Sequence, residues 1–131
     1  MVASGAARYR EVEVLTMQPA QRVVLLYSHL LSNLRQAKLL TEQREFEARA
    51  QRLGRAQDIV QELVVSLDHE AGGQIAGSLD SLYAFFLAEM IRLGAAREAG
   101  RFDPLIRMVT ELHGAWAQAA TQVTGASLSP A

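Results

Sequence analysis

The sequence predicts an all-α protein, an antiparallel up-down-up-down four-helix bundle with an N-terminal docking arm. Apolar residues recur at helical spacing in four segments, each of roughly 20 residues. Short stretches rich in glycine, proline and charged residues separate these segments, and short connections between helices of similar length join antiparallel neighbours. The chain has 131 residues, 50% of them hydrophobic, which suits one domain with a single core.

Composition excludes several classes of protein. The net charge is -1 and no segment gathers lysine and arginine, which argues against nucleic-acid binding. The chain has no cysteine, so it can form neither disulfides nor a thiolate zinc site. Residues 1–9 lack the apolar run of a signal peptide, and we expect a cytoplasmic protein.

Residues 1–18 form the predicted N-terminal arm. Tyr9, Val12, Val14 and Leu15 are apolar, but the segment is too short to fold alone, so we expect it to dock on the bundle. The bundle itself is predicted over residues 19–123. Residues 124–131 are small and polar and are predicted to be a disordered tail.

The first two helices are predicted from about Pro19 to Thr41 and from about Glu45 to Leu67. Pro19 suits a first helical turn, where a missing N–H costs nothing. The expected inward residues are Val23, Leu26, Tyr27, Leu30, Leu34 and Ala37 in the first helix and Phe46, Leu53, Ala56, Val60, Leu63, Val64 and Leu67 in the second.

The third helix, Ile75 to about Arg97, is the most informative segment because it is apolar on two sides. We expect a break between helices at Asp68–Gln74, where Gly72-Gly73 stops one helix and lets the chain turn back. One stripe is predicted to face the core: Ile75, Leu79, Leu82, Tyr83, Phe86, Met90 and Leu93. A second stripe lies opposite: Ala76, Ala84, Leu87, Ala88, Ile91 and Ala95. Asp80, Glu89 and Arg92 argue against a membrane span, so another segment, a second copy or a partner must cover the second stripe.

The fourth helix is predicted to begin near Asp103-Pro104, a capping residue followed by a first-turn proline. Trp116 is expected to be largely buried between helices. The other expected inward residues are Leu105, Met108, Val109, Leu112, Ala119 and Val123.

No arrangement of residues indicates catalysis, a cofactor or a metal. The Glu-x-x-His pairs of di-iron bundles are absent, and His29, His69 and His113 are expected at the surface or its margin. Glu89 borders the core stripe and is expected to pair with a nearby arginine. Gly72-Gly73 lacks the flanking strand and lysine of a phosphate loop. We therefore predict that the protein is not an enzyme.

Several motifs, in order and spacing, resemble the FliS family of flagellar secretion chaperones. They are Tyr9 followed by Pro19, Leu26-Tyr27, the stretch SLDHEAGGQIA (residues 66–76), Leu79, Leu82-Tyr83 and Ala115-Trp116. The sequence departs from the family pattern at Ser28, Ser78, Ala84 and Ala96, where more polar residues are usual.

The resemblance implies a cytoplasmic bundle that binds the disordered C-terminal segment of flagellin and prevents premature polymerisation. It also implies delivery to the flagellar export gate at the membrane, with Tyr9, Val12, Val14 and Leu15 of the arm contacting the gate. The expected cargo-binding residues are apolar and outward: Leu25, Leu31, Ile59, Ala84, Leu87, Ala88, Ile91 and Ala95.

Two alternatives remain open from the sequence. A helical adaptor or homodimerisation module would bury the second stripe against another copy, and a weak homodimer of a chaperone would do so in part. A helical-bundle enzyme or metal protein would instead hold a bound ion or substrate.

Overall fold

A computed structural model describes the backbone of residues 19–128 and the side chains of residues 19–122. Over this range the chain forms four α-helices and one short 3-10 helix, with no strand. They are α2 (Pro19–Glu42), α3 (Phe46–Val65), α4 (His69–Leu93), η1 (Ala99–Phe102) and α5 (Asp103–Leu128). The predicted all-helical four-helix bundle is confirmed. The arm residues Tyr9, Val12, Val14 and Leu15 lie outside the described residues.

The turn between α2 and α3 ends the first helix as predicted. The Glu45 N–H donates to the Leu40 carbonyl at 2.8 Å and the Arg44 N–H to the Thr41 carbonyl at 3.1 Å. This pair of bonds is a Schellman motif, which needs a left-handed residue at the position that Arg44 occupies with φ 60°.

The start of α4 differs from the prediction. The chain already reverses over residues 66–68, and Asp68 caps a new helix by accepting bonds from the Glu70 and Ala71 N–H groups at 3.1 and 3.0 Å. Gly73, with φ 49° and ψ -122°, then kinks α4. The predicted start of this helix, at Ile75, was therefore too late. The Asp68 cap starts a helical turn ahead of the glycines, and Gly73 kinks the helix instead of preceding it.

The connection from α4 to α5 also differs in detail. α4 ends at Leu93, earlier than predicted, and η1 precedes α5. Asp103 is the first residue of α5, and its carboxylate pairs with Lys38 of α2 at 2.7 Å. α5 continues to Leu128, past the predicted end at residue 123. Thr124, Gly125 and Ser127 are weak helix formers, so intrinsic helix propensity does not explain the extension into the predicted tail.

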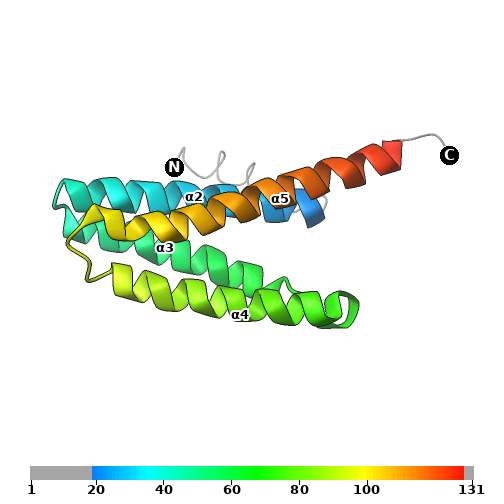
Figure 1. The fold of residues 1–131 in the computed structure, drawn as a ribbon, viewed down its shortest axis with the longest axis horizontal. Coiled ribbons are helices and arrows are strands. Elements are labelled where there is room, and N and C mark those ends of the chain that lie inside the picture. Colours follow the sequence, from blue (N-terminus) through cyan, green and yellow to red (C-terminus); the bar gives the residue numbers. More distant parts are fainter. Residues whose placement is uncertain (1–18, 129–131) are drawn as a thin grey trace, which may run out of the picture.

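α2 lies at the centre of the packing, against α3 on one side and α5 on the other, while α4 packs mainly on α3. Figure 1 shows α4 and α5 diverging from the end where η1 joins them. The buried core joins all four helices and η1: Tyr27, Leu30, Leu31, Leu34, Ala37, Leu53, Ala56, Val60, Leu63, Tyr83, Phe86, Met90, Leu93, Phe102, Leu105 and Val109.

Five residues contradict the predicted core. Ile75 is 72% exposed, whereas Ala76, predicted on the opposite stripe, is 3% exposed. The kink at Gly73 folds the first turn of α4 against Ala76, since a Cβ on Gly72 would lie 2.9 Å from that of Ala76. At the other end of the chain, Ala120 is buried in place of Ala119. Phe102, in no predicted stripe, is fully buried.

Trp116 is half-buried, less enclosed than predicted. Its ring lies 6.3 Å from that of Tyr27, and it packs against the edge of the core. Trp116 belongs to the second half of α5, where that helix diverges from α4 (Figure 1).

A hydrogen bond between two tyrosines lies inside the core. The hydroxyls of Tyr27 on α2 and Tyr83 on α4 are 2.8 Å apart, and both residues are at most 1% exposed. Burial raises the pKa of Tyr83 well above its ordinary value of 10.0. The free energy of unfolding should therefore fall as the pH rises above 10, because the unfolded chain ionises there first.

The two tyrosine hydroxyls are hydrogen-bonded to each other, so the losses of stability caused by the single and double substitutions should not be additive. Tyr27→Phe leaves the Tyr83 hydroxyl buried without its hydrogen-bond partner and should cost about 1–3 kcal/mol. In the double variant Tyr27→Phe/Tyr83→Phe no hydroxyl is left unpaired, and the loss should be smaller than the sum of the two single losses. Urea unfolding of the four proteins measures this coupling, and strictly additive losses would show that the bond does not stabilise the fold.

Candidate interaction surface

The second stripe of α4 is exposed along most of its length. Ala84, Ala88 and Ile91 follow one another at intervals of three or four residues on one side of the helix, and Ala95 continues this line in the turn that follows Leu93. We call these four residues the outer face of α4. All four are exposed, and Ile91 is 70% exposed. A large exposed aliphatic side chain among alanines forms a surface that a partner helix can approach closely.

Leu87 and Phe85 flank the outer face. Leu87, predicted among the cargo-binding residues, is half-buried and packs against the core, so it supports the fold as well as the surface. Phe85 is 44% exposed and was not among the predicted surface residues. Phe85 directly precedes the core residue Phe86 in the sequence, so the exposed ring and the buried ring differ only in the side of the helix that each residue faces.

The other predicted surface residues do not join the outer face. Leu31 is only 6% exposed and belongs to the core, so the prediction of an accessible Leu31 is wrong; it follows Leu30 at the centre of the packing, where α2 is covered on both sides. Ile59 lines a pocket between α2 and α3 together with His29 and Asn33. Leu25 is half-buried on α2. The structure therefore assembles one continuous surface from α4 alone.

An apolar depression lies in the N-terminal part of α4. Ile75, Leu79 and Leu82 line it together with Gln74 and Ser78, in a volume of ≈ 320 Å³. These three apolar residues were predicted to face the core. They are left partly open because α4 diverges from α5 here (Figure 1).

Arg49 secures the C-terminal end of α4, a role that was not predicted from the sequence. Arg49 is 6% exposed, and its guanidinium donates to the backbone carbonyls of Ala96 and, at 2.7 Å, Gly94. It also lies 4.6 Å from the ring centre of Phe46. Burial lowers the pKa of Arg49 from its ordinary value. The available signal was its helical spacing from the inward residues Phe46 and Leu53.

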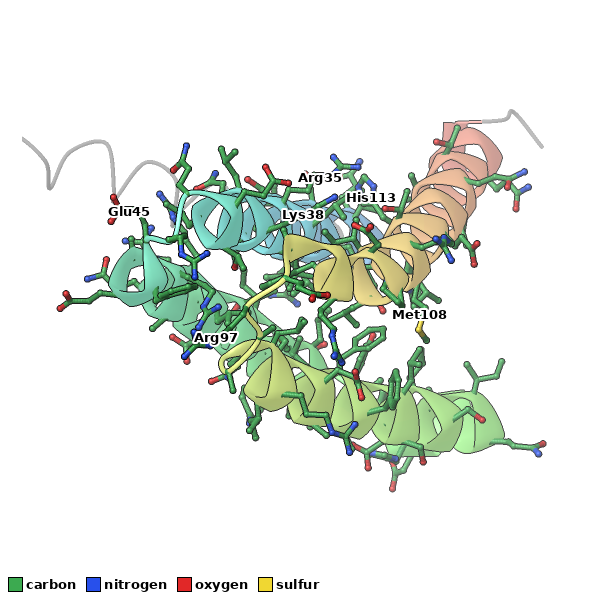
Figure 2. All side chains as sticks on the ribbon, turned by 60° about the vertical axis from the view of Figure 1, so that its left-hand side comes forward. Arg35, Lys38, Glu45, Arg97, Met108 and His113 are labelled. Carbon is green, nitrogen blue, oxygen red and sulfur yellow. The ribbon has the colours of Figure 1, made fainter. Side chains whose placement is uncertain are left out.

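A charged pocket begins where the outer face ends. Arg92, Arg97 and Arg101 line it with Glu89, Glu98 and Ala95, around a volume of ≈ 400 Å³ that we call the arginine pocket. The Arg92 guanidinium pairs with the Glu89 carboxylate, as expected for Glu89. Figure 2 shows Arg97 in the connection after α4, well away from Arg35, which lies on α2 at the top of the view.

The three histidines lie apart from one another. His29 and His69 are exposed, and His113 is half-buried on α5 (Figure 2). Within the described part of the chain, no three histidine, aspartate or glutamate side chains are grouped so as to hold a metal ion. Among the described helices, none is long and apolar enough to cross a membrane.

These features define a helical binding protein: a four-helix bundle that presents one apolar helix face bordered by charge. The family model described as "Flagellar protein FliS" matches residues 2–123, and the chain belongs to this family of flagellar secretion chaperones.

Individual relatives agree with this assignment. The flagellar secretion chaperone FliS of Vibrio cholerae is 31% identical over 100 residues, which are 76% of this chain and 74% of that protein. FliS of Salmonella typhimurium is 28% identical over 121 residues, covering 88% and 90% of the two chains. FliSB of Pseudomonas aeruginosa is 27% identical over 106 residues, covering 81% and 84%.

The fold also matches a solved structure. A crystal structure of a bacterial flagellar chaperone superposes with a TM-score of 0.74 at 17% identity, covering 93% of this chain and 99% of the other. At that identity the likeness concerns the arrangement of the helices.

Proposed function

We propose that this protein is a cytoplasmic export chaperone that binds the disordered C-terminal segment of flagellin and keeps it from polymerising. The observation that carries the proposal is the exposed outer face of α4, with Ile91 70% exposed among alanines. Membership of the FliS family supports the cargo assignment. The role needs binding and release only, and no catalytic step.

The physical properties of the surface suit a disordered cargo. A segment that folds on binding can wrap apolar surface at an ordering cost of about 2–5 kcal/mol. The alanines of the outer face leave room for a helix backbone to pack closely against α4. While bound in this way, the cargo cannot use the same apolar residues to pack against other flagellin molecules.

We further propose that the N-terminal arm takes part in delivery to the flagellar type III export gate. Tyr9, Val12, Val14 and Leu15 are the residues expected to make this contact. Deleting residues 1–15 should leave the four helices folded, which circular dichroism checks, and should reduce flagellin secretion in motile cells. Normal secretion by the truncated protein would contradict a role of the arm at the gate.

Binding of the cargo is tested directly with purified components. The full chain should form a one-to-one complex with the last ~50 residues of flagellin from the same genome, a length that forms helices matching those of this bundle. Light scattering gives the stoichiometry, and calorimetry gives the dissociation constant. A stable homodimer that does not bind this segment would instead favour a homodimerisation module.

A further inference from the structure

We propose that the arginine pocket binds an acidic side chain of the cargo segment that lies on the outer face of α4. This inference rests on the function proposed above and adds to it the polarity and position of the cargo: the bound segment carries a carboxylate where it passes the C-terminal end of α4.

The pocket has more positive than negative charge to offer a ligand. Arg97 and Arg101 have neither an ion pair nor a side-chain hydrogen bond to any residue that the structure describes. Arg92 is neutralised by Glu89, which leaves the carboxylate of Glu98 as the remaining acidic group of the lining. Two unpaired guanidinium groups against one carboxylate favour an anion in the pocket.

The end of α4 does not repel that anion as an ordinary helix C-terminus would. The last carbonyls of a helix carry a partial negative charge, which disfavours nearby carboxylates. Here Arg49 donates to the carbonyls of Gly94 and Ala96, which directly follow α4 beside the pocket. The positive charge of its guanidinium offsets the partial negative charge of the helix end. The positive charge of Arg97 and Arg101 is therefore not needed to neutralise the helix end and is available to a ligand.

The pocket is continuous with the outer face of α4. Ala95 belongs to both surfaces, and Arg92 directly follows Ile91. A helix docked on Ala84, Ala88 and Ile91 therefore reaches the pocket without a change of direction. A carboxylate on such a helix is held in place by the helix itself, whereas a chain terminus frays. An acidic side chain is for this reason the ligand, rather than the terminal carboxylate of flagellin.

The test measures binding of the flagellin C-terminal segment to charge variants of the full-length protein. Arg97→Gln/Arg101→Gln should weaken binding about tenfold at low salt and less at high salt. Glu98→Gln removes the competing carboxylate and should tighten binding, about twofold. Arg35→Gln removes one positive charge, against two in the double variant, at a position on α2 away from the pocket (Figure 2), and it should bind like the unaltered protein. Thermal unfolding confirms that each variant is folded.

The outcomes separate this inference from the proposed function. Equal binding by the double variant and by Arg35→Gln would overturn the arginine pocket while leaving the chaperone function standing. A segment that fails to bind the unaltered protein would overturn both. A segment with an amidated C-terminus should keep its full dependence on Arg97 and Arg101. Loss of that dependence on amidation would refute the acidic side chain as the ligand.

Discussion

Replacing Arg49 with methionine should lower the free energy of unfolding by about 3 kcal/mol, because two charge-assisted hydrogen bonds are lost. The Gly94 and Ala96 carbonyls then lose the donor that closes the end of α4. Methionine keeps the length and apolar contacts of the arginine stem, so the change reports mainly on the guanidinium. Urea unfolding monitored by circular dichroism measures the loss.

Two further variants make this result specific. Arg49→Lys keeps the charge but has one ammonium group for two carbonyls, so it should lose about half as much as the methionine variant. Arg55→Met, an exposed position on the same helix, should change the free energy of unfolding by less than about 0.5 kcal/mol. Equal free energies of unfolding for Arg49→Met and Arg55→Met would contradict the role assigned to Arg49.

Replacing Ile91 with aspartate should weaken flagellin binding by at least about tenfold, because a carboxylate without a partner would be buried under the cargo. The side chain is 70% exposed in the free chain, so the fold should be nearly unaffected. Calorimetry with the C-terminal segment of flagellin gives the affinity, and thermal unfolding gives the stability.

Ile75→Asp is the matched control. Ile75 is equally exposed, at 72%, and on the same helix. At 100° per residue it lies roughly 160° around α4 from Ile91, outside the outer face. It should therefore bind flagellin as the unaltered protein does. If Ile75→Asp strongly weakens flagellin binding and Ile91→Asp does not, the cargo binds instead at the depression formed by Ile75, Leu79 and Leu82.

The helices themselves were predictable because their signals are local. The periodicity of α2 and α3 predicted both helices and their buried residues, among them Tyr27, Leu34 and Val60. The exposed side of α4 followed from its second stripe, of which Ala84, Ala88, Ile91 and Ala95 are exposed. Periodicity depends only on the geometry of one helix, so a single sequence is enough to read it.

Errors arose where a second element decides the outcome. Ile75 fits the core stripe by spacing, but α4 is kinked at Gly73 and diverges from α5 there, so no residue that the structure describes covers it. Leu31 looked available for cargo until the packing of α2 against two helices placed it in the core. No property of these residues alone distinguishes the two environments.

The sequence by itself determined the number of helices, most of their core stripes and the apolar second side of α4. Only the tertiary structure decided that Arg49 of α3 closes the end of α4 and that Arg92, Arg97 and Arg101 line one pocket there. Side-chain periodicity fixes which face of a helix is apolar. The meeting of charged groups from different elements depends on where the helices end and how they cross, which long-range packing sets.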